Sequence, residues 1–193
     1  MSPNDGRYHV NPATDGRTVV WQAHGADILE YESTTRVIDV ATGEESVIQT
    51  AAPGTALGPT AVTGSHVYWL LDEIGQNGTT ALRRAGLDGS GVTDLSPETG
   101  PGALNVAALT VSEEAVTVVA RTPSAELRNE SPAKLRQFAP RGGGDDMVRS
   151  RVSCNRGEQL SAAAAAGTQV LWLDGTTGIS NVVIRTRPTG TCA

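Results

Sequence analysis

A short phrase recurs four times along this chain, at intervals of about fifty residues. The four copies run over 15–21 (DGRTVVW), 63–69 (TGSHVYW), 112–119 (SEEAVTVV) and 166–172 (AGTQVLW). The equivalent positions lie 48, 49 and 54 residues apart: Gly16, Gly64, Glu113 and Gly167. A period of this length is typical of repeat architectures, in which one supersecondary unit is copied along the chain. The repeat therefore limits the possible folds more than any single motif does.

The residues around each phrase predict short strands separated by tight turns. Asp15-Gly16 is a strong hairpin signal, because both residues tolerate positive φ. In the strand that follows, Val19 and Trp21 share one face and Val20 lies on the other. With 22 glycines and 10 prolines in 193 residues, turns are frequent and the strands must be short.

Each repeat has room for about four strands. The sequence therefore predicts an all-β fold, a β-propeller of about four four-stranded antiparallel blades, with the last blade incomplete. The predicted blades form one array over residues 1–193 and span 8–50, 58–97, 104–152 and 158–190. The run Ala162–Ala166 has high helix propensity, but its position in the repeat assigns it to an inner strand. The tryptophan near the end of the second strand, which the third copy replaces with Val118, is expected to fill the widening space between blades.

The repeated phrases resemble the TolB-type β-propeller repeat. The resemblance rests on DGRTVVW followed by VIDVATG at 37–43, and on VYW at 67–69 followed by RAGLDGSGVT at 84–93. It implies the propeller fold but no particular activity, because members of this class serve as exported binding modules and as accessory domains of peptidases.

TolB-type propellers usually have six or more blades, so the resemblance implies a partial propeller. Three explanations stay open: a fragment of a longer protein, a small four-bladed propeller, or completion by a second chain. Residues 7–10 are one candidate for the outer strand of the last blade, and a strand from a partner is another. An open sheet edge would favour association.

The two cysteines, Cys154 and Cys192, predict a disulfide. Their spacing does not fit a metal site, since there is no C-x-x-C and no histidine nearby. A disulfide would imply an oxidising compartment, and two free buried thiols are the alternative. No signal peptide is visible after Met1. Together with the resemblance, the cysteines predict an extracellular or periplasmic protein.

Candidates for catalysis or metal binding are few. His24 lies near Asp27 and Glu30, but without the H-x-H or H-E-x-x-H spacing of metal sites. The acidic pairs at 113–114 and 145–146 are assigned to turns, because adjacent strand residues point to opposite faces and cannot form a carboxylate dyad. The chain has no G-x-S-x-G, Walker A or G-x-G-x-x-G motif. We therefore predict no catalytic, cofactor-binding or metal-binding residues and no cofactor.

The charge and the loops suggest the class of function. A net charge of −6 disfavours nucleic acid as a partner, and no apolar run approaches the ~20 residues of a membrane span. We expect a non-catalytic binding or scaffold module, with a protein or carbohydrate ligand at the propeller face or at three variable loops, 25–30, 75–79 and 123–132. The alternative is the propeller portion of a hydrolase, lyase or peptidase.

Overall fold

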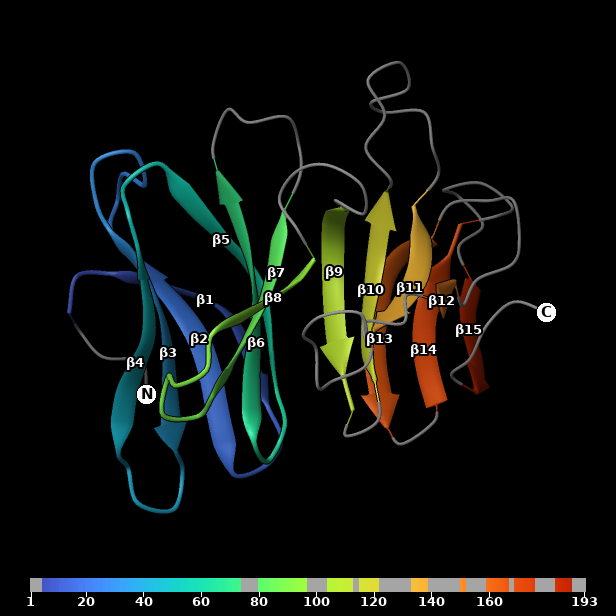
Figure 1. The fold of residues 1–193 in the computed structure, drawn as a ribbon, viewed down its shortest axis with the longest axis horizontal. Coiled ribbons are helices and arrows are strands. Elements are labelled where there is room, and N and C mark those ends of the chain that lie inside the picture. Colours follow the sequence, from blue (N-terminus) through green and yellow to red (C-terminus); the bar gives the residue numbers. More distant parts are fainter. Residues whose placement is uncertain are drawn as a thin grey trace. The chain divides into compact units, whose positions relative to one another are not determined.

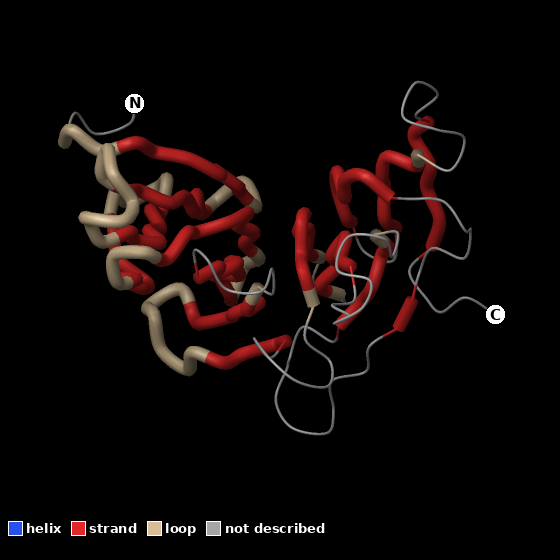
Figure 2. The backbone as a smooth tube through the Cα atoms, turned by 90° about the horizontal axis from the view of Figure 1, so that it is seen from above, coloured by secondary structure: helices blue, strands red, loops and turns tan. Residues whose placement is uncertain are grey.

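The computed structural model describes residues 5–73, 80–96, 104–112, 115–121, 133–138, 150–151, 159–166, 169–175 and 183–188. Within these residues the chain consists of strands and turns without a helix, which confirms the predicted all-β class (Figures 1 and 2). No helix in this part of the chain could cross a membrane. The chain divides into two compact units, Met1–Asp94 (unit 1) and Leu95–Ala193 (unit 2).

Unit 1 contains two four-stranded sheets in which neighbouring strands follow one another in the sequence. Sheet 1 has the order β1 (Tyr8–Thr14), β2 (Thr18–His24), β3 (Ser33–Asp39) and β4 (Glu45–Ala51). Sheet 2 has the order β5 (Thr55–Val62), β6 (His66–Glu73), β7 (Ala81–Gly86) and β8 (Thr93–Ser96). Strands β1 to β4 pair in antiparallel fashion, and so do β5 to β7, as the hairpin signals predict.

Aspartate side chains close several turns of unit 1. Between β1 and β2, Asp15 Oδ1 accepts the backbone N–H groups of Arg17 and Thr18, at 2.9 and 2.8 Å, and Gly16 has a φ of 96°. A non-glycine residue rarely adopts that φ, so the Asp-Gly signal is explained by this turn. Between β7 and β8, Asp88 Oδ1 accepts both the N–H and the hydroxyl of Ser90. This turn is thus closed by its own side chains.

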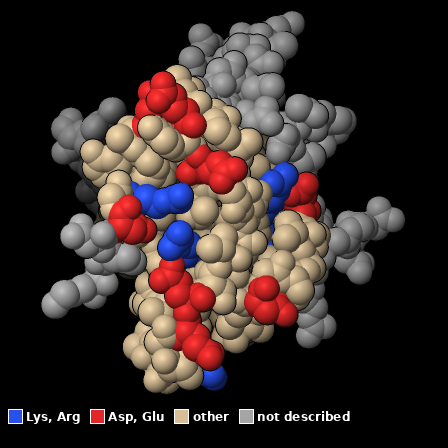
Figure 3. Space-filling view, turned by 90° about the vertical axis from the view of Figure 1, so that its left-hand side faces the viewer, with Lys and Arg blue, Asp and Glu red and all other residues tan. Residues whose placement is uncertain are grey.

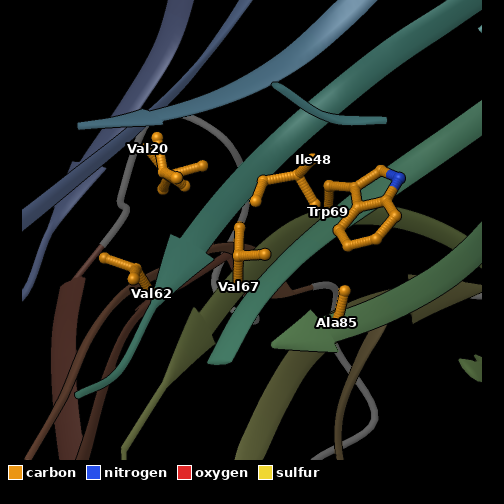
Figure 4. Packing of buried hydrophobic residues seen from close by; sticks show 7 residues of the cluster. Val20, Ile48, Val62, Val67, Trp69 and Ala85 are labelled. Carbon is orange, nitrogen blue, oxygen red and sulfur yellow. The ribbon is translucent and has the colours of Figure 1, made fainter. Parts of the chain in front are cut away.

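The core of unit 1 lies between its two sheets (Figure 4). Val20, Val37 and Ile48 of sheet 1 cluster with four residues of sheet 2: Val62, Val67, Trp69 and Ala85. Trp69 is fully buried in this cluster, which is the place that the repeat predicts for it.

Asn11 connects the two sheets with polar contacts. It has a left-handed φ of 53° and sits where the register of β1 and β2 shifts; asparagine tolerates this conformation better than most residues. Its Nδ2 donates to Gln22 Oε1 at 2.8 Å and to the Gly58 carbonyl at 3.2 Å. Its own carbonyl accepts the Thr60 hydroxyl at 2.5 Å. Sheet 1 is therefore hydrogen-bonded to β5 through one residue.

Next to Asn11, sheet 1 carries a row of buried polar side chains. Four of their atoms have no hydrogen-bond partner in the described part of the chain: Gln22 Nε2, Ser33 Oγ, Thr35 Oγ1 and Gln49 Oε1. Thr35 lies between Gln22 and Gln49 in the strand register and is fully buried. A buried hydroxyl without a partner keeps its full desolvation cost.

We expect Thr35→Val to stabilise the protein by about 1 kcal/mol, because valine has nearly the same shape and removes an unpaired buried hydroxyl. Chemical denaturation would measure the change. Thr34→Val is the matched control: the Thr34 hydroxyl accepts the Arg36 Nε–H at 3.1 Å, so this substitution should destabilise. Equal effects of the two substitutions would contradict the explanation.

Unit 2 contains a four-stranded and a three-stranded sheet. Sheet 3 has the order β12 (Ser150–Arg151), β11 (Lys134–Phe138), β10 (Val116–Arg121) and β9 (Asn105–Val111). Sheet 4 has the order β13 (Gln159–Ala166), β14 (Gln169–Asp174) and β15 (Val183–Pro188). Ala162–Ala166 lies within β13, so the predicted strand is correct.

The core of unit 2 also contains a tryptophan of the repeated phrase. Val170 and Trp172 of sheet 4 cluster with Ala108, Val119 and Leu135 of sheet 3 and with Ala133, which precedes β11. Trp172 is buried and therefore has the same packing role as Trp69.

One candidate strand is assigned wrongly by the sequence. Residues 7–10 were expected to be available as an outer strand for the last blade, but Tyr8, His9 and Val10 pair with β2 inside sheet 1. These residues therefore belong to sheet 1, because β1 begins at Tyr8. Other predictions fall outside the described residues, namely the Cys154–Cys192 disulfide, the acidic pairs at 113–114 and 145–146, and the loops 75–79 and 123–132.

Candidate functional site

Exposed apolar side chains gather at the end of sheet 1 where β2 leads into β3. Tyr8, Leu29 and Tyr31 are 58%, 60% and 54% exposed. The Tyr8 ring stacks on His24, with 5.5 Å between ring centroids and 28° between the planes. We call these four residues the aromatic rim. They come from the start of β1, the end of β2 and the 25–32 loop, which includes the variable loop 25–30 that the sequence singles out.

Local contacts hold the 25–32 loop in place. Asp27 Oδ1 accepts the Leu29 N–H at 2.8 Å, and the Asp27 carbonyl accepts the Tyr31 N–H at 3.0 Å. A Cβ on Gly25 would lie 2.8 Å from Tyr31 Cβ, so the tyrosine packs directly on the glycine backbone. The Ile28 carbonyl accepts the N–H of Gly54 at 2.9 Å, which ties the loop to the connection between the sheets. The rim is therefore presented on an ordered loop.

The sequence places His24 near Asp27 and Glu30, but these three side chains do not form a metal site in the structure. His24 Nδ1 lies 2.8 Å from the Gly25 carbonyl, which can only accept a hydrogen bond, so Nδ1 carries the proton. Asp27 uses a carboxylate oxygen to hold the loop. Among the described residues, no three histidine, cysteine, aspartate or glutamate side chains are close enough to hold a metal ion.

An Asp-His pair that sequence reasoning missed lies at the start of β1. His9 Nε2 is 3.0 Å from Asp5 Oδ1, and His9 Nδ1 accepts the Trp21 indole N–H at 3.0 Å. Since the indole can only donate, Nδ1 is unprotonated and Nε2 donates to Asp5. The hydrogen bond from His9 lowers the pKa of Asp5 below its ordinary value. Both ring nitrogens are occupied, so His9 orients Trp21 and has no lone pair free for general-base work.

The charge around the rim is acidic. Asp27, Glu30 and Glu32 are all exposed in the same loop as Leu29 and Tyr31. On the face of the described residues drawn in Figure 3, acidic and basic groups are otherwise interspersed among uncharged side chains. The rim thus combines exposed aromatic rings with local negative charge.

A second repeated feature lies opposite the tryptophans. In every sheet, an arginine of the third strand is the register partner of the tryptophan of the repeated phrase, or of the valine that replaces this tryptophan. The register pairs are Trp21 with Arg36, Trp69 with Arg83, Val118 with Arg136, and Trp172 with Arg185.

The first two of these arginines form ion pairs with the fourth strand. Arg36 contacts Glu45 at 2.6 Å and Arg83 contacts Asp94 at 2.7 Å. Alignment of the third strands of the repeat would have found these arginines. The ion pairs of Arg36 and Arg83 join the third strand to the fourth, which gives these two arginines a structural role.

Comparison with known proteins identifies the fold. No family model matches the chain, and no curated protein sequence matches it. Among solved structures, TolB from Acinetobacter baumannii matches 94% of this chain and 41% of its own length, with a TM-score of 0.66 and 12% identity. A structure from a study of two prolyl endopeptidases matches 96% of this chain and 28% of its own, with a TM-score of 0.65 and 12% identity.

A third match comes from a nidogen/laminin complex. It covers 94% of this chain and 60% of its own length, with a TM-score of 0.57 and 15% identity. The chain thus spans less than two thirds of each of these structures. At such identities the likeness concerns the fold, and it agrees with the four sheets and their repeated cores.

Proposed function

We propose that this chain, which has a TolB-like β-propeller fold, is a non-catalytic binding module of an exported protein. Its ligand is a polypeptide that contacts the aromatic rim. The observation that carries the proposal is the exposure of Tyr8, Leu29 and Tyr31 at one end of sheet 1. Exposed aromatic side chains on an ordered loop supply contact area at low entropic cost, and they are enriched at protein interfaces.

The charge of the loop narrows the class of ligand. Asp27, Glu30 and Glu32 surround the rim with carboxylates, so a partner segment that carries arginine or lysine would gain electrostatic attraction. A structure taken from a nidogen/laminin complex has the same fold, which supports a protein ligand over a carbohydrate. The predicted cysteine pair supports export to an extracellular or periplasmic location.

The enzymatic alternative receives less support from the described residues. A peptidase propeller is similar in fold, but the Asp5-paired His9 uses both ring nitrogens for hydrogen bonds. The rim has no nucleophile held against a base. A binding role therefore explains the exposed side chains better than catalysis does.

Selection from a library of displayed short peptides would test the proposal. Peptides selected on the wild-type chain should carry basic residues, and Tyr31→Ala should weaken their binding about tenfold or more, as for an aromatic interface anchor. Isothermal titration calorimetry with the selected peptides would measure the change. Val40→Ala is the matched control, because Val40 is 58% exposed but lies in the turn between β3 and β4. Equal binding by wild type and Tyr31→Ala would reject the rim as the site.

A further inference from the structure

His24 has one ring nitrogen that can accept a hydrogen bond from a ligand. Its Nδ1 carries the proton, because this atom lies 2.8 Å from the Gly25 carbonyl. In a neutral imidazole the other nitrogen, Nε2, is then an acceptor with a lone pair. Within the described part of the chain, no donor lies within hydrogen-bond distance of His24 Nε2. The residue is also partly exposed, so this lone pair is a feature of the aromatic rim that the fold itself does not use.

The ring of Tyr8 helps to fix the orientation of the His24 ring. Tyr8 and His24 are register partners on β1 and β2, so their side chains point to the same face of sheet 1. The two rings stack with 5.5 Å between their centroids. The stack and the Nδ1 hydrogen bond hold the imidazole together, which gives Nε2 a defined position in the rim. Tyr8 is 58% exposed despite the stack, so much of this residue stays accessible.

The surroundings of His24 favour a cationic donor. Asp27, Glu30 and Glu32 are exposed in the loop that follows His24, but none of the described carboxylates forms an ion pair with it. An exposed tyrosine ring also attracts a cation that lies over its face. Arginine fits these features better than lysine does. Its planar guanidinium group stacks on aromatic rings and donates hydrogen bonds in its own plane, whereas the lysine ammonium group is a compact point charge.

We propose that the aromatic rim recognises an arginine side chain of the polypeptide ligand, and that His24 Nε2 accepts a hydrogen bond from its guanidinium group. This inference rests on the proposed function and narrows the ligand from a basic segment to one that carries arginine. It also makes binding depend on pH. A proton on Nε2 turns the acceptor into a donor and adds a positive charge, so protonated His24 repels the guanidinium group. Because histidine changes its charge between pH 5 and 8, the ligand binds more weakly at pH 5 than at pH 8.

Two substitutions of His24 would test the role of Nε2 with the peptides selected on the wild-type chain. His24→Phe keeps a ring that can stack on Tyr8 but has no acceptor. It should raise the dissociation constant about tenfold or more, as for the loss of a hydrogen bond to a charged group. His24→Gln also lacks the imidazole Nδ1, but it carries an amide oxygen that can accept, so it should restore much of the lost affinity. His66→Phe, at a histidine of β6, is the control and should leave binding unchanged. Circular dichroism would check that each variant folds.

Changing the peptide tests whether the contact is with arginine. Replacing its arginine with lysine should weaken binding to the wild-type chain about tenfold. The same replacement should have a much smaller effect on His24→Phe, because two groups that contact each other show non-additive losses.

The pH profile provides a readout that a structural role of His24 would not change. Between pH 8 and pH 5, binding to the wild-type chain should weaken by a larger factor than binding to His24→Gln. Strand β5, which packs on β2, has no titratable side chain. The remaining charged or titratable groups near the rim are the same in both chains, so comparison of the two profiles isolates His24: Asp5, Arg7, Tyr8 and His9 at the start of β1, and Tyr31 with the three carboxylates of the loop.

The failure of this inference can be told apart from the failure of the proposed function. If no peptide is selected, or if Tyr31→Ala leaves binding unchanged, the rim is not the site and both are overturned. If Tyr31→Ala weakens binding, four results would overturn the inference alone. These are equal binding of the arginine and lysine peptides, equal binding by wild type and His24→Phe, a His24→Gln chain as weak as His24→Phe, and equal pH dependence in wild type and His24→Gln.

Discussion

Replacing Trp69 with alanine is expected to lower the free energy of unfolding by about 3–5 kcal/mol, the usual cost of removing a large aromatic side chain from a core. Trp69 is fully buried between sheets 1 and 2, among residues from both. The substitution would therefore remove the contacts of the indole ring within sheet 2 and also its contacts with sheet 1. Denaturant unfolding followed by circular dichroism would measure the loss of stability.

Trp69→Phe is the matched control for this prediction. The indole Nε1 has no hydrogen-bond partner among the described residues, so phenylalanine loses volume but no polar contact. It should cost less than half as much as alanine does. If alanine and phenylalanine cost the same, the filling of the space between the sheets would not explain the tryptophan.

A disulfide between Cys154 and Cys192 is expected to contribute about 4 kcal/mol to stability, the entropic gain of closing a loop of about 39 residues in the unfolded chain. The first measurement is the mass of the denatured, unreduced protein after alkylation, which should show no added label. Adding a reductant should then lower the denaturation midpoint.

The double variant with Cys154→Ser and Cys192→Ser is the control for reduction. It should unfold at the midpoint of the reduced wild type, and the reductant should not change it. Two alkylated thiols in the unreduced wild type would show that the disulfide is absent. The main support for an oxidising compartment would then be lost, because it rests on this disulfide.

The repeat in the sequence predicts most of the strand arrangement. Alternation around Val19, Val20 and Trp21 places these residues on the faces where the structure has them, because strand geometry has a fixed period of two. Ala162–Ala166 shows why the repeat matters more than propensity. An alanine run favours a helix by itself, but packing within a sheet decides its conformation, since helix propensity is a weak preference.

The features that the sequence does not predict depend on contacts between distant residues. The bulge at Asn11 needs Gln22 and Gly58 as partners, and nothing local to Asn11 indicates them. Only Leu29 of the aromatic rim lies in the predicted loop 25–30, and the stacking of Tyr8 on His24 joins two strands. The proton position on His9 likewise follows from Asp5 and Trp21, which the sequence separates by 16 residues.

Asn11 also has a consequence for how the chain unfolds. In a linear array of sheets, each sheet can open with only the loss of its contacts to its neighbours. Asn11 adds hydrogen bonds from sheet 1 to the Gly58 carbonyl and the Thr60 hydroxyl of β5. If β1 detaches, these part-buried groups lose their partners at the same time. Sheets 1 and 2 should therefore open together as one cooperative unit, with shared protection of their amide hydrogens from exchange.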